Sequence, residues 1–259
     1  MRFLNFLKFL AVAALLSGCQ HYIPPSGRVD LSAISSPASP ESASQRPSGS
    51  GPTLQESFAA RPAAGFPAGI AAVRVQAPAY RSYYTEREGG VYGAGRYSVI
   101  TVKEVEDEAD FERLSKLPEI AGLISISPLL LPQKLEDERQ LREAAARLKA
   151  DMLLLYTFET TFHDKDFAPP LTAVTLGLSP NRQISVHVTA SALLIDTRTG
   201  FIYAAFETNE KQKLLSDAFT SNLMADRARQ NAEKAAFKGL VKEFETQWPA
   251  VVERAKKGA

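Results

Sequence analysis

Cysteine is nearly absent from this chain of 259 residues, which contains a single one, Cys19. A chain with one cysteine cannot form a disulfide within itself, so its stability depends on packing alone. Neither charge dominates, because 30 basic side chains stand against 29 acidic ones. That balance argues against nucleic acid as a partner, since nucleic-acid binding needs a basic surface. The apolar run 9–16 has eight residues, whereas a membrane-spanning helix needs roughly 20.

The first 19 residues have the layout of an export signal. Arg2 and Lys8 make the start positive, the apolar run 9–16 follows, and small residues precede Cys19. This is the order of a cleaved signal peptide. The residues Leu16-Ser17-Gly18-Cys19 resemble the bacterial lipobox, in which the thiol receives diacylglycerol, cleavage occurs before the cysteine, and the new amine is acylated. We predict a signal peptide at 1–18 and an acylated Cys19 that anchors the protein to a membrane.

Position 20 bears on where such a lipoprotein goes. It is Gln rather than Asp, and in enteric-type bacteria this choice implies transfer to the outer membrane. The expected location is the outer membrane, with the folded domain facing the periplasm.

The segment after the cysteine has the composition of a linker. Residues 24–53 are mostly Ser, Pro, Gly and Ala. Such a segment cannot bury enough apolar surface to offset the entropy lost on ordering. We predict a disordered tether over 19–65 and a single folded domain over 66–259.

Strand and helix patterns alternate in the remaining sequence. They predict strands at 69–77, 96–105, 120–127, 151–162, 183–196 and 201–208, and helices at 107–117, 136–150 and 216–254. Strand–helix–strand crossovers need parallel neighbours, whereas the short connection after 196 needs an antiparallel pair. The expected fold is α/β in the α+β sense, with one mixed β-sheet packed with helices. The apolar run 152–155 indicates a central strand covered on both faces.

Few residues in this chain have a pattern that suggests catalysis. The best metal candidate is His163-Asp164-Lys165-Asp166, but ligation needs three or four converging ligands and Lys165 places a positive charge among them. We therefore expect 163–166 to be a solvated loop tip, in an insertion that interrupts the sheet over 163–182. His187 falls inside a strand, and the glycines of 89–95 do not match a phosphate-binding loop. These patterns predict no enzyme activity, no metal, no cofactor and no small-molecule substrate.

Two regions have the composition of a contact surface. Tyrosines crowd residues 80–97, and exposed tyrosine is common at interfaces; Tyr83, Tyr84 and Tyr92 are the candidates. The stretch 171–178 is apolar and lies between prolines. Its Leu176 and Leu178 either point outward as a contact surface or fold back over the core.

Two short motifs connect the chain with a known superfamily. The helix at 136–150 ends in Ala150-Asp151 directly before an apolar strand, and the strand at 183–196 ends in Asp196-Thr197-Arg198-Thr199-Gly200. In the second motif Asp bonds the following amides and Gly supplies a positive φ. Here the chain resembles the curli-secretion-lipoprotein superfamily, whose relatives include penicillin-binding-protein activator lipoproteins and the N-terminal domain of the Tol-system translocation protein. The resemblance covers about residues 69–250 and implies the fold predicted above.

The chain departs from the pore-forming members of that superfamily. A membrane-inserted hairpin needs strands of about 9–11 residues with an outward apolar face. The loop 78–95 is charged, and the stretch 171–178 has no matching second strand before 183. The sequence therefore favours a scaffold or regulator over a pore.

These observations lead to three hypotheses for the function. The leading hypothesis is a non-enzymatic outer-membrane lipoprotein whose periplasmic domain binds or regulates another cell-envelope protein. The alternative is a subunit of an oligomeric secretion or envelope assembly that associates with itself through 163–182. A cell-wall hydrolase is the third, and no residue pattern supports it.

Overall fold

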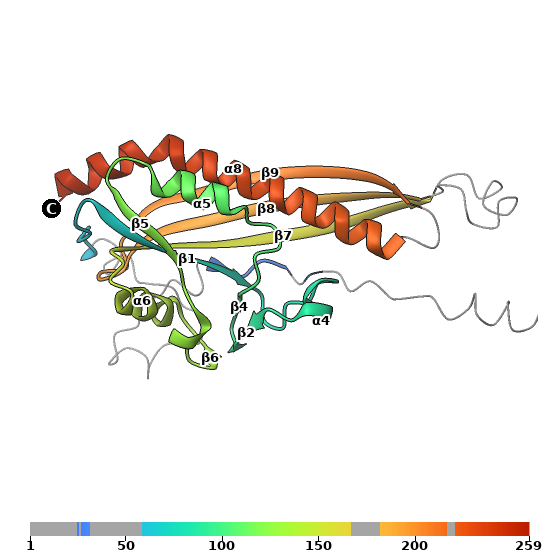
Figure 1. The fold of residues 1–259 in the computed structure, drawn as a ribbon, viewed down its shortest axis with the longest axis horizontal. Helices are drawn as coiled ribbons and strands as arrows, with labels where there is room; N and C mark the ends of the chain where they lie inside the picture. Colours follow the sequence, from blue (N-terminus) through green and yellow to red (C-terminus); the bar gives the residue numbers. More distant parts are fainter. Residues whose placement is uncertain (1–24, 26, 32–58, 167–181, 217–220, 259) are drawn as a thin grey trace, which may run out of the picture.

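The computed structural model describes residues 25, 27–31, 59–166, 182–216 and 221–258, and Figure 1 shows its fold. In chain order its elements are β1 (Ala68–Gln76), α4 (Thr85–Glu88), β2 (Val91–Tyr92), β3 (Ala94–Gly95), β4 (Ser98–Ile100), α5 (Glu108–Ser115), β5 (Ile120–Ser125), the 3-10 turn η1 (Pro128–Leu130), β6 (Lys134–Leu135), α6 (Glu138–Arg147), β7 (Met152–Asp166), β8 (Arg182–Asp196), β9 (Ile202–Ser216) and α8 (Ser221–Gly258).

The main sheet is mixed, as the sequence predicted. Its strands follow the order β2-β4-β1-β7-β8-β9, and β5 also pairs with β1. β1 runs parallel to β5 and β7 and antiparallel to β4. β7, β8 and β9 are antiparallel neighbours. A second, two-stranded sheet pairs β3 with β6.

Each face of the sheet packs against its own hydrophobic core. Met152 and Leu154 of β7 point into the core that α5 and α8 cover. Leu153 and Leu155 point into the opposite core, which includes the apolar face of α6. Figure 1 shows α8 along one side of the long strands and α6 on the other. The prediction of a central strand covered on both faces is confirmed.

The two larger helices follow their sequence patterns. Asp137 caps α6 in a reciprocal capping box with Gln140, and Leu141 and Ala144 are fully buried. α8 is 38 residues long and continues through Pro249. The six residues predicted to form its core face are all buried: Phe237, Leu240, Val241, Phe244, Trp248 and Val251.

The strands β7, β8 and β9 are longer than predicted, with 15 residues each. Residues 163–166 continue β7, and Arg182 begins β8, opposite Asp166. The loop tip expected at His163-Asp164-Lys165-Asp166 is therefore wrong. These polar residues form strand because the neighbouring strand satisfies their backbone groups, which composition alone does not reveal. Residues 167–181 lie outside the described residues.

The strand predicted at 96–105 is shorter than expected. Only Ser98–Ile100 is strand, paired with residues 74–76 of β1. The parallel strand β5 pairs with residues 68–72 of β1. β4 is therefore short, because β5 occupies the remaining length of β1.

Part of the segment predicted as a tether packs against the sheet. We call residues 27–31 the N-terminal strap. Val29 is 5% exposed and belongs to the core around Ala71, and Leu31 packs against the same cluster. The Ala77 amide donates to the Gly27 carbonyl over 3.3 Å. For these residues the structure differs from the predicted tether, because Val29 has an apolar site to fill.

Candidate functional site

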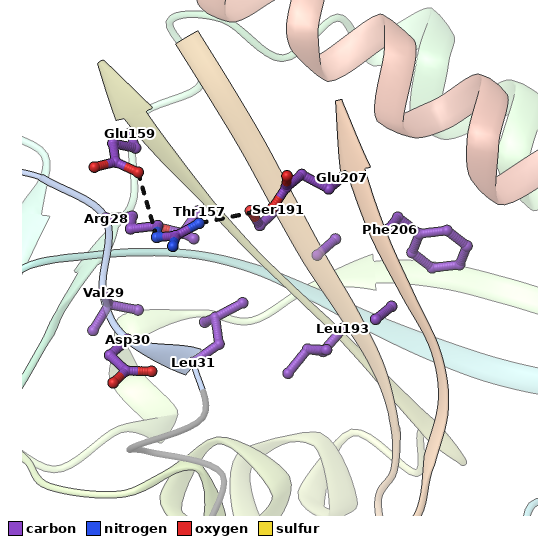
Figure 2. A pocket seen from close by; sticks show the side chains of 12 residues that line it. Arg28, Val29, Asp30, Leu31, Thr157, Glu159, Ser191, Leu193, Phe206 and Glu207 are labelled. Carbon is purple, nitrogen blue, oxygen red and sulfur yellow. Dashed lines mark hydrogen bonds and ion pairs between the residues drawn. The ribbon is translucent and has the colours of Figure 1, made fainter. Parts of the chain in front are cut away.

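A groove of about 700 Å³ lies between the N-terminal strap and the outer face of the long strands (Figure 2). Residues 28–31 form one wall. The rest of the lining comes from the three strands: Thr157, Glu159, Ser191, Ala192, Leu193, Ala205, Phe206 and Glu207. A β-strand displays alternate residues on each face. Among the residues that line the groove, Ser191 and Ala205 have small side chains, which leave the space open.

Arg28 bridges two carboxylates of this groove. Its Nε lies 3.4 Å from a Glu159 oxygen and its Nη1 lies 3.7 Å from a Glu207 oxygen. The three side chains are about half exposed, so each ion pair contributes at most about 1 kcal/mol. The lining has one basic side chain against three acidic ones, with Asp30 as the third. The lining therefore has more acidic than basic side chains.

A second, smaller cleft of about 280 Å³ brings together two of the predicted contact tyrosines. Tyr83 and Tyr84 line it opposite the first turns of α8, where Leu223 is 48% exposed. The Arg87 guanidinium lies 4.3 Å from the centre of the Tyr83 ring. Partner contact at these tyrosines stays a prediction.

The other tyrosines of this region lie elsewhere. The Tyr92 hydroxyl donates to the Leu131 carbonyl over 2.9 Å, so this ring braces the loop before α6. Tyr80 and Tyr97 are buried. The crowding of tyrosines in the sequence therefore corresponds to several environments in the fold.

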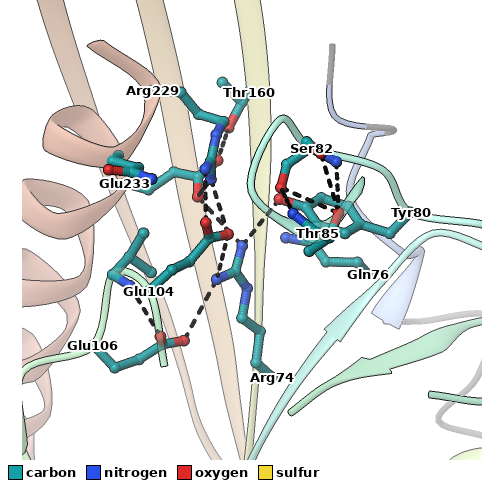
Figure 3. A network of polar contacts seen from close by, with 12 residues as sticks. Arg74, Gln76, Tyr80, Ser82, Thr85, Glu104, Glu106, Thr160, Arg229 and Glu233 are labelled. Atoms are coloured by element: carbon teal, nitrogen blue, oxygen red, sulfur yellow. Dashed lines mark hydrogen bonds and ion pairs between the residues drawn. The ribbon is translucent and has the colours of Figure 1, made fainter. Parts of the chain in front are cut away.

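A buried network of charged side chains joins β1, the β4–α5 connection and α8 (Figure 3). The Arg229 guanidinium donates to both oxygens of Glu104, over 3.0 and 2.7 Å, and to Glu233 over 2.8 Å. Arg74 donates to Glu233 over 3.3 Å, and another of its nitrogens lies 3.7 Å from Glu106. All five side chains are at most 2% exposed.

The network also holds hydroxyl groups in place. The Thr160 hydroxyl donates to Glu233 over 2.7 Å, and the Tyr156 hydroxyl donates to Glu106 over 3.0 Å. Burial and the Glu106 carboxylate raise the pKa of Tyr156 well above its ordinary value. Burial alone would lower the pKa of Arg229, but Glu233 and its other neighbours raise it. Tyr156 therefore stays neutral and Arg229 stays charged near neutral pH, and the network fits a structural role.

The sequence patterns described above do not predict this network. The signal in the sequence is a charged residue inside an otherwise apolar pattern. Arg74 lies between buried valines in β1, and Arg229 lies on α8 beside buried alanines. Such a residue is almost never fully buried unless it is paired, but the sequence does not show that Arg74 and Arg229 both donate to Glu233.

The two strand histidines meet on neighbouring strands. The ring centroids of His163 and His187 are 5.2 Å apart. Slight burial and the nearby charge of Lys211 lower the pKa of His187. Among the described residues no group of three or more potential ligands could hold a metal ion. The lysine charge makes this place unfavourable for a cation.

Asp196 forms the turn that its motif predicts and also bonds beyond it. One carboxylate oxygen accepts from the amides of Arg198 and Thr199, over 2.9 and 3.0 Å. The other accepts from the Tyr203 hydroxyl and the Ala63 amide, each over 2.7 Å. Gly200 has φ 73°. This carboxylate therefore fixes the β8–β9 hairpin and the chain entering β1.

Three residues named from the sequence lie outside the described residues: Cys19, Leu176 and Leu178. No helix in the described ranges combines the length and the apolar character needed to cross a membrane.

No protein-family model matches the chain, and no curated protein matches it. Similar solved structures include a candidate lipoprotein from Caulobacter crescentus CB15, with 13% identity and TM-score 0.24 over 38% of this chain and 64% of that one. A Xanthomonas campestris protein of the DUF330 family has 12% identity and TM-score 0.34, over 74% and 91% of the two chains. A candidate homologue of the neuraminyllactose-binding hemagglutinin from Helicobacter pylori has 10% identity and TM-score 0.38, over 77% and 95%.

These resemblances are distant. The chain spans less than two thirds of the Caulobacter protein. The similarity is to bacterial proteins that include a candidate lipoprotein.

Proposed function

We propose that this protein is a non-enzymatic lipoprotein, anchored in the outer membrane through Cys19, whose periplasmic domain binds or regulates another cell-envelope protein. The observation that carries the anchor is the Leu16-Ser17-Gly18-Cys19 motif behind a basic start and a short apolar run. The resemblance of the Asp196–Gly200 motif to the curli-secretion-lipoprotein superfamily adds support for a role in the envelope.

The groove and the tyrosine cleft support the binding half of the proposal. The groove lies along the long strands of the sheet, and the tyrosine cleft lies between the turn before α4 and the first turns of α8. The acidic lining of the groove favours a partner segment with basic side chains. Tyr83 and Tyr84 supply aromatic contact area of the kind found at interfaces.

Substitution of the predicted anchor tests the first half. Cys19→Ala is expected to abolish incorporation of a palmitate analogue and to move the protein out of the membrane fraction, because the acceptor thiol is lost. Ser17→Ala is the matched control, since it keeps a small residue before the cysteine and should leave acylation intact. Acylation of the Cys19→Ala protein would contradict the anchor.

Site-specific crosslinking in the native envelope tests the second half. A photoreactive phenylalanine analogue at Tyr84 or Ala205 should form an adduct with a different envelope protein. Lys257 is 73% exposed on its side chain. It lies at the far end of α8 from the tyrosine cleft and on the face of the sheet away from the groove, so the same analogue there is the control. Equal adducts at all three positions would contradict a specific contact.

One observation favours the oligomeric alternative. β9 is a 15-residue edge strand that pairs with β8 and with no other strand in the described part of the chain. Such an edge is a template for pairing with another chain, although Glu207, Lys211 and Lys213 place charges along it. In the crosslinking experiment, adducts of Ala205 with a second copy alone would favour this alternative.

A further inference from the structure

We infer that the N-terminal strap sets the distance and orientation of the domain at the membrane, so that the end of the sheet where β1 finishes faces the lipid. This inference rests on the acylation of Cys19 in the proposed function. In this arrangement the domain is attached to the chain at residues 27–31, so the connection to Cys19 is shorter than the tether over 19–65 that the composition suggests.

The strap is attached at three consecutive positions. The Gly27 carbonyl accepts from the Ala77 amide. Arg28 pairs with carboxylates on two strands. Val29 is buried in the core on this face of the sheet. Backbone, charge and apolar contacts therefore act together on a short piece of chain, and this is the first described run of residues after Cys19.

The position of the strap limits the distance to the lipid. Eight residue steps separate Cys19 from Gly27, and at roughly 3.6 Å a step they reach at most about 29 Å. A free tether of the predicted length would allow a separation several times larger. The sheet should therefore lie near the membrane whatever the length of the Ser- and Pro-rich segment.

The chain is attached to the domain again before β1. Ala63 donates its amide to Asp196, and the Thr199 hydroxyl donates to the Arg61 carbonyl over 2.7 Å. Residues 32–58 therefore connect two attached points on the domain. Their length does not enter the distance between the domain and Cys19.

The register of the sheet gives the orientation. Ile70 pairs with Met152, which pairs with Asp196, so the Asp196 turn lies at the start of β1. Gln76 and Ala77 lie at its other end, beside the strap. Figure 1 shows α4 toward this second end and the C-terminus of α8 toward the first. The cleft of Tyr83 and Tyr84 therefore lies on the membrane-facing side.

Energy transfer to labelled lipids tests the orientation. Acylation leaves no free thiol, because the chain has one cysteine, so Glu86→Cys and Lys257→Cys each accept one dye. Both side chains are exposed. In vesicles of phosphatidylethanolamine and phosphatidylglycerol with an acceptor lipid, the dye at 86 should show the greater transfer. Equal transfer, or greater transfer from 257, would overturn the orientation.

Two insertions of 20 Gly/Ser residues test the distance. Inserted after His21, they should lower the transfer from the dye at 86, because they add a coil of about 25 Å between lipid and strap. Inserted after Gln45, they should leave it unchanged. A change with the second insertion and not with the first would overturn the inference.

Release of the strap provides a further check. In an Arg28→Ala, Val29→Asp protein, the insertion after Gln45 should now lower the transfer. No change would show that the strap does not hold the domain. Palmitate-analogue labelling accompanies each measurement: loss of labelling would overturn the lipoprotein and this inference together, whereas labelled protein with the wrong transfer pattern overturns the inference alone.

Discussion

Replacement of Arg229 by methionine is expected to lower the free energy of unfolding by about 3–5 kcal/mol. Arg229 is fully buried and supplies hydrogen bonds to Glu104 and Glu233. Methionine fills a similar volume but leaves two carboxylates without their main cation. Buried charges that lose a partner are costly, because they have also lost water. Urea unfolding followed by circular dichroism measures the change.

The matched control lies two residues away on the same helix. Arg227 is exposed on α8, and Arg227→Met is expected to change the stability by no more than about 0.5 kcal/mol. Similar small losses for both variants would contradict a structural role for the network. The comparison separates the loss of a buried ion pair from the loss of one positive charge.

Replacement of Asp196 by alanine should cost about 3 kcal/mol at neutral pH. Its carboxylate accepts four hydrogen bonds, three from within the β8–β9 hairpin and one from the Ala63 amide in the chain before β1. Hydrogen bonds to a charged group contribute about 1.5–3 kcal/mol each, and bonds to one group are not additive. Tyr203→Phe removes one of the four and should cost about 1.5 kcal/mol, the lower end of that range. Equal losses in the two variants would contradict the wider role of the carboxylate.

The cost of Asp196→Ala should depend on pH. Burial alone would raise the pKa of this carboxyl, but the bonds from Tyr203, Thr199, Ala63 and Arg198 lower it below its ordinary value. A lowered folded-state pKa gives stability that is present above the unfolded pKa of about 3.9. That stability is lost as the pH falls through the folded-state pKa. The difference between wild type and variant should therefore shrink below about pH 4, and a constant difference would contradict this origin.

Patterns that depend on local sequence predicted the fold well. The apolar run 152–155 indicated the central strand because every residue in it is buried. The core face of α8 followed the helical period. Both features come from a buried face on which apolar residues recur at a regular spacing. That spacing can be recognised within a single segment of sequence.

Features that depend on distant segments were missed. The polar residues 163–166 are strand because 182–185 pair with them. Val29 is buried because the sheet offers an apolar site, while its neighbours in sequence have the composition of a linker. Arg74 and Arg229 belong to one network, although 155 positions separate them in the chain. In each case the partner is supplied by the fold.

The length of α8 has a mechanical consequence. At about 1.5 Å per residue its 38 residues extend about 57 Å, along strands of comparable length to which its apolar face is packed. A helix fixed along a sheet resists bending more than either layer alone, because bending would require the two close-packed surfaces to slide. The domain should therefore move as a rigid body along its long axis, so that a displacement at one end moves the other end by a similar amount.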